Sequence, residues 1–144
     1  MKVKSVLFLL LFTLLYTNAF SQMKLTWKEL TTVYHKETLT TKSDYKEKLS
    51  LKDVEGKQVT VQGYFLDIGA EASWYMLSRF PFENCFFCTG VGPETVIELV
   101  GYQNNKTKFE TDDIITVTGN LYLVKDYGEY IYVLENCTAK PSGS

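Results

Sequence analysis

The sequence contains only one histidine, His35, and only three cysteines. A single histidine excludes metal sites built from several imidazoles and leaves most of the chain without the commonest general base. Lysine and arginine are scattered and do not form the basic stripe that a phosphate backbone requires, so nucleic acid is not expected as a partner. No nucleophile and base pair, phosphate-binding loop or paired-carboxylate signature is present in the sequence. These absences predict a protein that is not an enzyme.

Residues 1–21 have the pattern of a secretory signal peptide. Two lysines precede an apolar run that is too short for a comfortable membrane span, which disfavours the alternative of a retained membrane helix. Ala19 and Ser21 fit the small positions before a signal-peptidase site, so we expect cleavage before Gln22 and no membrane anchor afterwards. The expected location is therefore the periplasm or the exterior of the cell.

The remaining chain predicts one small domain that is mainly β. Residues 22–55 would hold a short helix, marked by the capping-box spacing of Thr26 and Glu29, followed by a polar segment that wraps the surface. Residues 56–139 alternate apolar and polar side chains with the period of a strand, and residues 140–144 would form a flexible tail. The expected strands lie in the ranges 57–68, 73–79, 94–102, 113–125 and 128–136.

Gly63 and Gly119 lie near the middle of the first and fourth expected strands. A glycine inside a strand often marks a bulge or a sharp bend. Two long strands that bend centrally are typical of a small closed barrel. We therefore predict a five-stranded OB-like antiparallel barrel with a short N-terminal helix, and the alternative is an open antiparallel sheet packed on that helix.

Residues 83–93, ENCFFCTGVGP, contain Cys85 and Cys88 at a spacing used by several kinds of site. Haem attachment requires a histidine directly after the second cysteine, and Thr89 stands there. A thiol-disulfide oxidoreductase requires a helix N-terminus to lower the thiol pKa, and the glycines and proline after Cys88 disfavour a helix. Two interpretations remain. We favour a local disulfide between Cys85 and Cys88 in an oxidising compartment, and the alternative is half of a zinc or copper site.

The third cysteine, Cys137, follows the fifth expected strand. The third and fifth strands of an OB barrel run parallel, so we expect Cys137 to lie near the end of the third strand. Cys85 and Cys88 precede the third strand and would lie at the opposite rim. Cys137 is therefore not expected to join them.

The loop of residues 80–93 is unusually apolar. We expect its aromatic side chains to plug one end of the barrel. The alternative is that some of them remain exposed as a docking patch, for which Phe82, Phe86 and Phe87 are the candidates.

The runs GKQVTVQGYFL, YMLSRFP, CFFCTGVGPETVIEL, VTGNLYL and YIYVL resemble an uncharacterised family of exported bacterial proteins, domain of unknown function 3299, over about residues 55–136. The resemblance implies an OB-like barrel without established activity, and some members are associated with periplasmic transport or metal homeostasis. We therefore expect an exported, non-enzymatic OB-like interaction module of the cell envelope, whose partner is an envelope protein such as a transport-associated one. The alternative is a periplasmic metal-binding or metal-delivery protein that uses Cys85 and Cys88.

Overall fold

The computed structural model describes residues 22–38, 49–69, 74–84, 90–104, 107–126 and 128–143. The predicted signal peptide, residues 1–21, lies outside these ranges, as do Cys85, Phe86, Phe87 and Cys88. Within the described ranges, no helix is long and apolar enough to cross a membrane.

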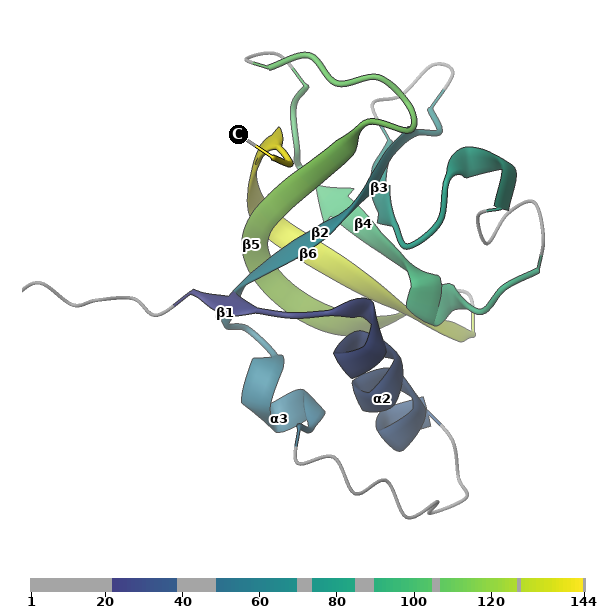
Figure 1. Cartoon of the computed structure of the whole chain (residues 1–144). Helices are drawn as coiled ribbons and strands as arrows, with labels where there is room; N and C mark the ends of the chain where they lie inside the picture. Colours follow the sequence, from purple (N-terminus) through teal and green to yellow (C-terminus); the bar gives the residue numbers. More distant parts are fainter. Residues whose placement is uncertain are drawn as a thin grey trace, which may run out of the picture.

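The described chain is mainly β, and its six strands belong to one sheet. The strands are β1 (Met23–Lys24), β2 (Gln58–Asp67), β3 (Tyr75–Ser78), β4 (Val96–Val100), β5 (Ile114–Asp126) and β6 (Glu129–Pro141). Their order is β1-β2-β3-β4-β6-β5, and β5 also pairs with β2, which closes a ring of hydrogen bonds (Figure 1). β4 and β6 run parallel, as expected for the third and fifth predicted strands.

The five strands predicted from the sequence are all present, and β1 is an additional sixth strand. β1 consists of Met23 and Lys24 and pairs in parallel with Val59 and Thr60 of β2. A strand of this length has no periodicity that a sequence could show. β6 is longer than predicted, because it continues to Pro141.

The predicted N-terminal helix is confirmed as α2 (Trp27–Thr38). Its capping box is formed as expected, because the Thr26 backbone N–H donates to Glu29 Oε2 at 2.7 Å and the Glu29 N–H donates to Thr26 Oγ1 at 3.3 Å. The segment predicted only to wrap the surface contains a second short helix, α3 (Leu51–Val54). Val54 is fully buried, so α3 contributes to the core.

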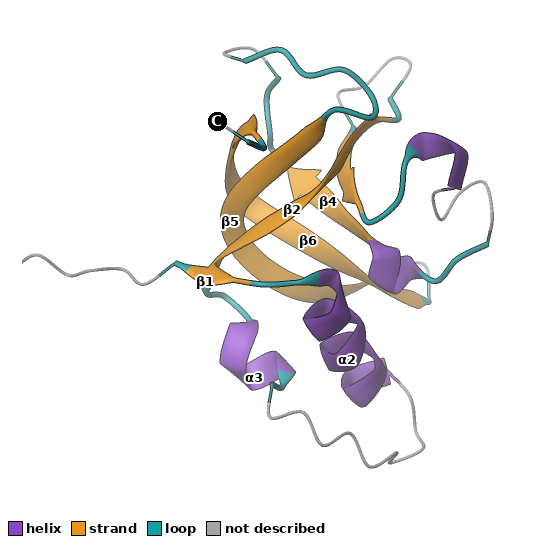
Figure 2. Cartoon of the chain, in the orientation of Figure 1, coloured by secondary structure: helices purple, strands orange, loops and turns teal. Residues whose placement is uncertain are grey.

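The core fills the inside of the ring and continues under the helices. Val61 and Phe65 of β2 and Val117 of β5 point inward and are buried together with Leu30 of α2. Figure 2 shows α2 and α3 together at one end of the curved sheet. The Tyr132 hydroxyl of β6 donates to the Leu30 carbonyl at 2.9 Å, which fastens α2 to that end.

The bulge predicted at Gly119 is present, but the extra residue belongs to the neighbouring strand. The register between β5 and β6 shifts at this point, so that Asn136 and Cys137 of β6 both lie opposite Gly119. Asn136 has a φ of 53°, in the left-handed region that asparagine tolerates better than most residues. The bend is therefore built on β6, and Gly119 provides the space beside it.

Gly63 is needed for a different reason from the predicted one. A Cβ atom at this position would lie 2.5 Å from the Ser78 carbonyl oxygen and 3.0 Å from the Trp27 ring. Neither Gly63 nor Gly119 has a positive φ. Glycine is required at both positions because backbone and side chains approach closely, and not because of special backbone angles.

Candidate functional site

Phe82 is the one docking candidate that lies within the described residues. It begins the short 3-10 helix η1 (Phe82–Asn84), and 41% of its surface is exposed. Its backbone N–H donates to Asp112 Oδ1 at 2.7 Å, which attaches η1 to the segment before β5. The chain therefore holds an aromatic side chain in solvent on a fixed backbone.

The expectation that the aromatic loop plugs one end of the ring is wrong for Phe82, whose side chain is exposed. Phe80, Phe82 and Val91 belong neither to the buried core nor to the side chains packed against it. A different aromatic cluster packs within and against the core. The cluster consists of Phe65, Tyr75, Tyr102 and Phe109.

The remaining predictions for this loop concern residues outside the described ranges. The docking roles of Phe86 and Phe87 stay predictions, and so do the disulfide and the alternative metal half-site of Cys85 and Cys88. Among the residues that the structure describes, no group of three or more histidine, cysteine and acidic side chains could hold a metal ion. His35 Nε2 lies 3.9 Å from Glu94 Oε1, in the 3-10 helix η2 (Pro93–Thr95), so this contact links α2 to the segment before β4.

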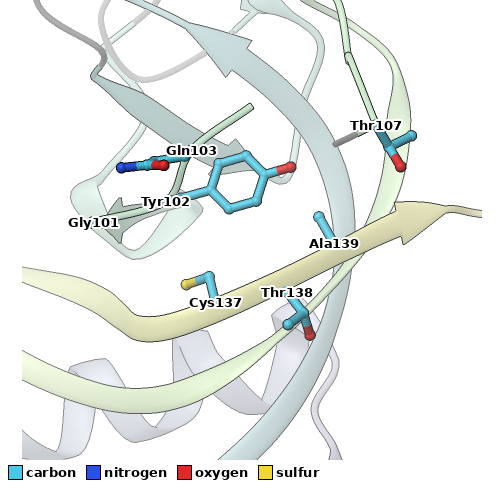
Figure 3. Close-up of a pocket in the computed structure, with 7 residues that line it drawn as sticks. All are labelled: Gly101, Tyr102, Gln103, Thr107, Cys137, Thr138 and Ala139. Carbon is cyan, nitrogen blue, oxygen red and sulfur yellow. The ribbon is translucent and has the colours of Figure 1, made fainter. Parts of the chain in front are cut away.

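A hollow of about 320 Å³ opens between β6 and the turn that follows β4 (Figure 3). The hollow results from the parallel pairing of β4 and β6. β4 ends at Val100, whereas β6 continues to Pro141, so this part of β6 has no β4 residue beside it. This pairing also places Cys137 beside the segment after β4, as the sequence predicted. The lining residues are Gly101, Tyr102, Gln103, Thr107, Cys137, Thr138 and Ala139.

Cys137 is a free cysteine and is half-buried in this hollow. Its thiol donates to the Leu134 carbonyl at 3.0 Å. Burial, and secondarily the Glu135 carboxylate, raise the pKa of the Cys137 thiol to about 12. The thiol is protonated at neutral pH, so Cys137 is a poor nucleophile and a poor metal ligand there.

Tyr102 forms the opposite wall of the hollow. Its ring centroid lies 5.8 Å from that of Tyr75 and 6.3 Å from that of Phe65, both in edge-to-face geometry. Burial raises the pKa of the Tyr102 hydroxyl, with smaller contributions from Cys137 and Tyr75. The ring is thus held by the aromatic cluster. Tyr102 was not among the predicted site residues, because the sequence marks it only as the last residue of the third expected strand, 94–102.

A second hollow, of about 340 Å³, lies outside the ring, near β1 and the start of α2. The Trp27 indole N–H donates to the Gln62 carbonyl at 2.8 Å, which joins α2 to β2 along this hollow. Trp27 therefore has a structural role in holding the helix. The lining residues are Lys24, Leu25, Thr26, Trp27, Thr60, Gln62 and Thr116.

No protein-family model matches the chain. A search of curated proteins gives no match either. The resemblance to a family of exported bacterial proteins therefore stays a prediction from the sequence.

Proposed function

We propose that this protein is an exported, non-enzymatic interaction module of the cell envelope, built on an OB-like barrel. In this proposal, the rim that carries η1 docks onto another envelope protein. The single observation that carries the proposal is the exposure of Phe82, because 41% of this large apolar side chain is exposed and it is not part of the buried core.

The strand order supports the OB-like part of the proposal. If β1 is set aside as an addition, the other strands follow the order β2-β3-β4-β6-β5 and return to β2. The pairing of β4 with β6 is parallel, and the other pairings in this circuit are antiparallel. This pattern is compatible with a five-stranded Greek-key barrel, an architecture that serves many unrelated proteins as a binding scaffold.

The setting of Phe82 supports protein docking. Aromatic side chains are enriched in the centres of protein interfaces, where they fill pockets on the partner. The hydrogen bond from the Phe82 backbone to Asp112 fixes the segment before binding, which lowers the entropy lost on association. The expected partner is an envelope protein that presents an apolar pocket with a polar border.

The proposal can be tested by the native size of the protein in envelope extracts. Wild-type protein should elute in a complex well above the mass of the processed chain, which is smaller than the 16.5 kDa of the full 144 residues. Phe82→Asp should shift it to its own mass, because a carboxylate cannot enter an apolar pocket without losing its hydration. Val124→Asp, at a position on β5 that is 37% exposed, is the matched control and should leave the complex intact. Elution of the wild type at its own mass, or equal effects of the two variants, would contradict the proposal.

A further inference from the structure

We propose that the hollow between Tyr102 and β6 binds a neutral saccharide unit. This site lies on different segments from Phe82, so it adds a second binding activity to the proposed protein docking. The hollow has a volume of about 320 Å³, at the lower end of the range found for small-molecule sites.

The hollow is open because β6 carries small side chains where its neighbour ends. Beyond Val100, β6 is faced by the turn that contains Tyr102 and no longer by β4. Figure 3 shows Cys137 and Ala139 on the side of β6 that faces the Tyr102 ring. The thiol of Cys137 and the methyl group of Ala139 are small. A larger pair of side chains would fill the space between β6 and the Tyr102 ring.

The chemistry of the lining favours an uncharged ligand. Among the residues that the structure describes, those that line the hollow are neutral side chains or glycine. The nearby Glu135 carboxylate contributes to the raised pKa of Cys137, and it would repel an anion in the same way. A cationic ligand would find no opposite charge among the lining residues to offset the loss of its hydration.

The lining combines an apolar floor with polar groups above it. Cys137 and Ala139 form the floor, and the Tyr102 ring offers an apolar face. The Thr107 hydroxyl lies on the side of the ring to which the Tyr102 hydroxyl points, and the Gln103 amide lies on the other side (Figure 3). A sugar ring has the matching pattern, because its C–H groups can pack on an aromatic face while its hydroxyls form hydrogen bonds at the edge. A purely apolar ligand would bury the Tyr102 and Thr107 hydroxyls without offering them a hydrogen bond, which costs free energy.

Cys137 belongs to the floor and does not react in this proposal. Its thiol donates to the Leu134 carbonyl at 3.0 Å and stays protonated at neutral pH. The ligand is therefore expected to bind reversibly, without a covalent bond to sulfur.

The test is to titrate the full chain, in the form in which it accumulates on expression, with small ligands. Binding is monitored through the backbone amide chemical shifts. The probes are glucose, N-acetylglucosamine and cellobiose, with glucuronate as the anionic counterpart and cyclohexanol as the apolar one. We expect saturable shifts at residues 101–103 and 137–139 with at least one neutral sugar, and weaker binding of both counterparts. If no neutral sugar produces saturable shifts there, or if glucuronate or cyclohexanol binds as tightly, the proposal is wrong.

Two single-residue variants test whether the sugar binds in this hollow. Thr107→Val removes a hydroxyl from an exposed loop position and should weaken the best sugar about threefold to tenfold without affecting folding. Thr31→Val is the matched control, because Thr31 lies on α2 and is not among the residues that line the hollow, and it should leave affinity unchanged. Equal affinities of Thr107→Val and the wild type would overturn the site.

Discussion

Asn136 and Cys137 form the bulge of β6 just beyond its last pair with β4, where β6 stays paired with β5. Asn136 takes a φ of 53° and inserts the extra residue of the bulge. Cys137 then lies over Gly119, where a Cβ atom would approach the sulfur to 3.2 Å. The same bulge directs the Cys137 side chain toward Tyr102. A local backbone irregularity thus produces the hollow that we propose as a ligand site.

Valine at either central glycine should destabilise the fold. Gly63→Val and Gly119→Val would place side-chain atoms against the carbonyls of Ser78 and Glu135, at Cβ distances of 2.5 Å and 2.8 Å. Overpacking of this kind typically costs about 1–3 kcal/mol. Gln62→Val, on the exposed face of β2, is the control and should change stability by less than about 0.5 kcal/mol. Urea unfolding measures all three, and a wild-type midpoint for both glycine variants would show that the strands do not approach as described.

The raised pKa of the Cys137 thiol predicts that the protein loses stability at alkaline pH. Its pKa rises from 9.0 to about 12 on folding. The contribution of this pKa shift to the unfolding free energy is fully present below pH 9.0 and is lost as the pH rises toward about 12. The reason is that the thiol loses its proton at a lower pH in the unfolded chain than in the folded chain. Unfolding free energies measured at about pH 8 and about pH 10.5 should fall less in Cys137→Ala than in the wild type.

The pKa values of Tyr102 and Tyr132 are also raised, and these shifts remain in Cys137→Ala. Some of the decrease in unfolding free energy at alkaline pH should therefore persist in this variant. Cysteine alkylation provides an independent readout. The peptide with Cys137 should be modified slowly in the native protein and rapidly in urea. An identical pH dependence in Cys137→Ala and the wild type would show that this thiol is not perturbed.

At the scale of the elements, the start of α2 could be predicted because its signal is local. Thr26 and Glu29 stand at the spacing of a capping box, and the structure forms it. The strands of the ring could also be predicted, because their inward residues alternate over enough positions. The C-terminal end of β6 and the existence of β1 could not be predicted. Asn136 interrupts the alternation in β6, and β1 depends on pairing with a strand distant in sequence.

Removal of the cap should weaken α2 and its packing on the ring. Thr26→Ala should lower the unfolding free energy by about 1 kcal/mol, because the Glu29 N–H loses its acceptor. Thr31→Ala is the matched control inside the helix. The Thr31 hydroxyl donates to the Trp27 carbonyl, a bond that contributes little to a helix, and alanine has the higher helix propensity. Thermal unfolding should therefore separate the two variants, and equal melting temperatures would contradict the role of the cap.

At the scale of the whole molecule, the sequence predicted where the third cysteine lies. The parallel arrangement of β4 and β6 places Cys137 beside Tyr102, after the end of β4. The hollow itself could not be predicted, because it depends on three features that meet only in the fold: the end of β4, the bulge in β6 and the turn at Tyr102. The position of Phe82 outside the core was also hidden, since the apolar loop sequence suits a plug as well as a docking patch.

The three cysteines should separate into one pair and one free thiol. We predict a disulfide between Cys85 and Cys88 in protein taken from an oxidising compartment, with Cys137 unpaired. Peptide mapping under non-reducing conditions tests this pairing. A bond from Cys137 to either of the others would refute it. Two free thiols, together with a near-stoichiometric metal that is lost in Cys85→Ser, would instead establish the metal-binding alternative.

Site-specific photocrosslinking in the intact envelope tests the central claim most directly. A benzophenone amino acid at position 82, replacing Phe82, should form a light-dependent adduct with one envelope protein, and excess wild-type protein should compete it away. The same probe at Val124, which is similarly exposed on β5, should form no such adduct. The account predicts an adduct specific to position 82. The absence of any adduct there, or the same adducts from both positions, would contradict the proposal that this rim binds a partner.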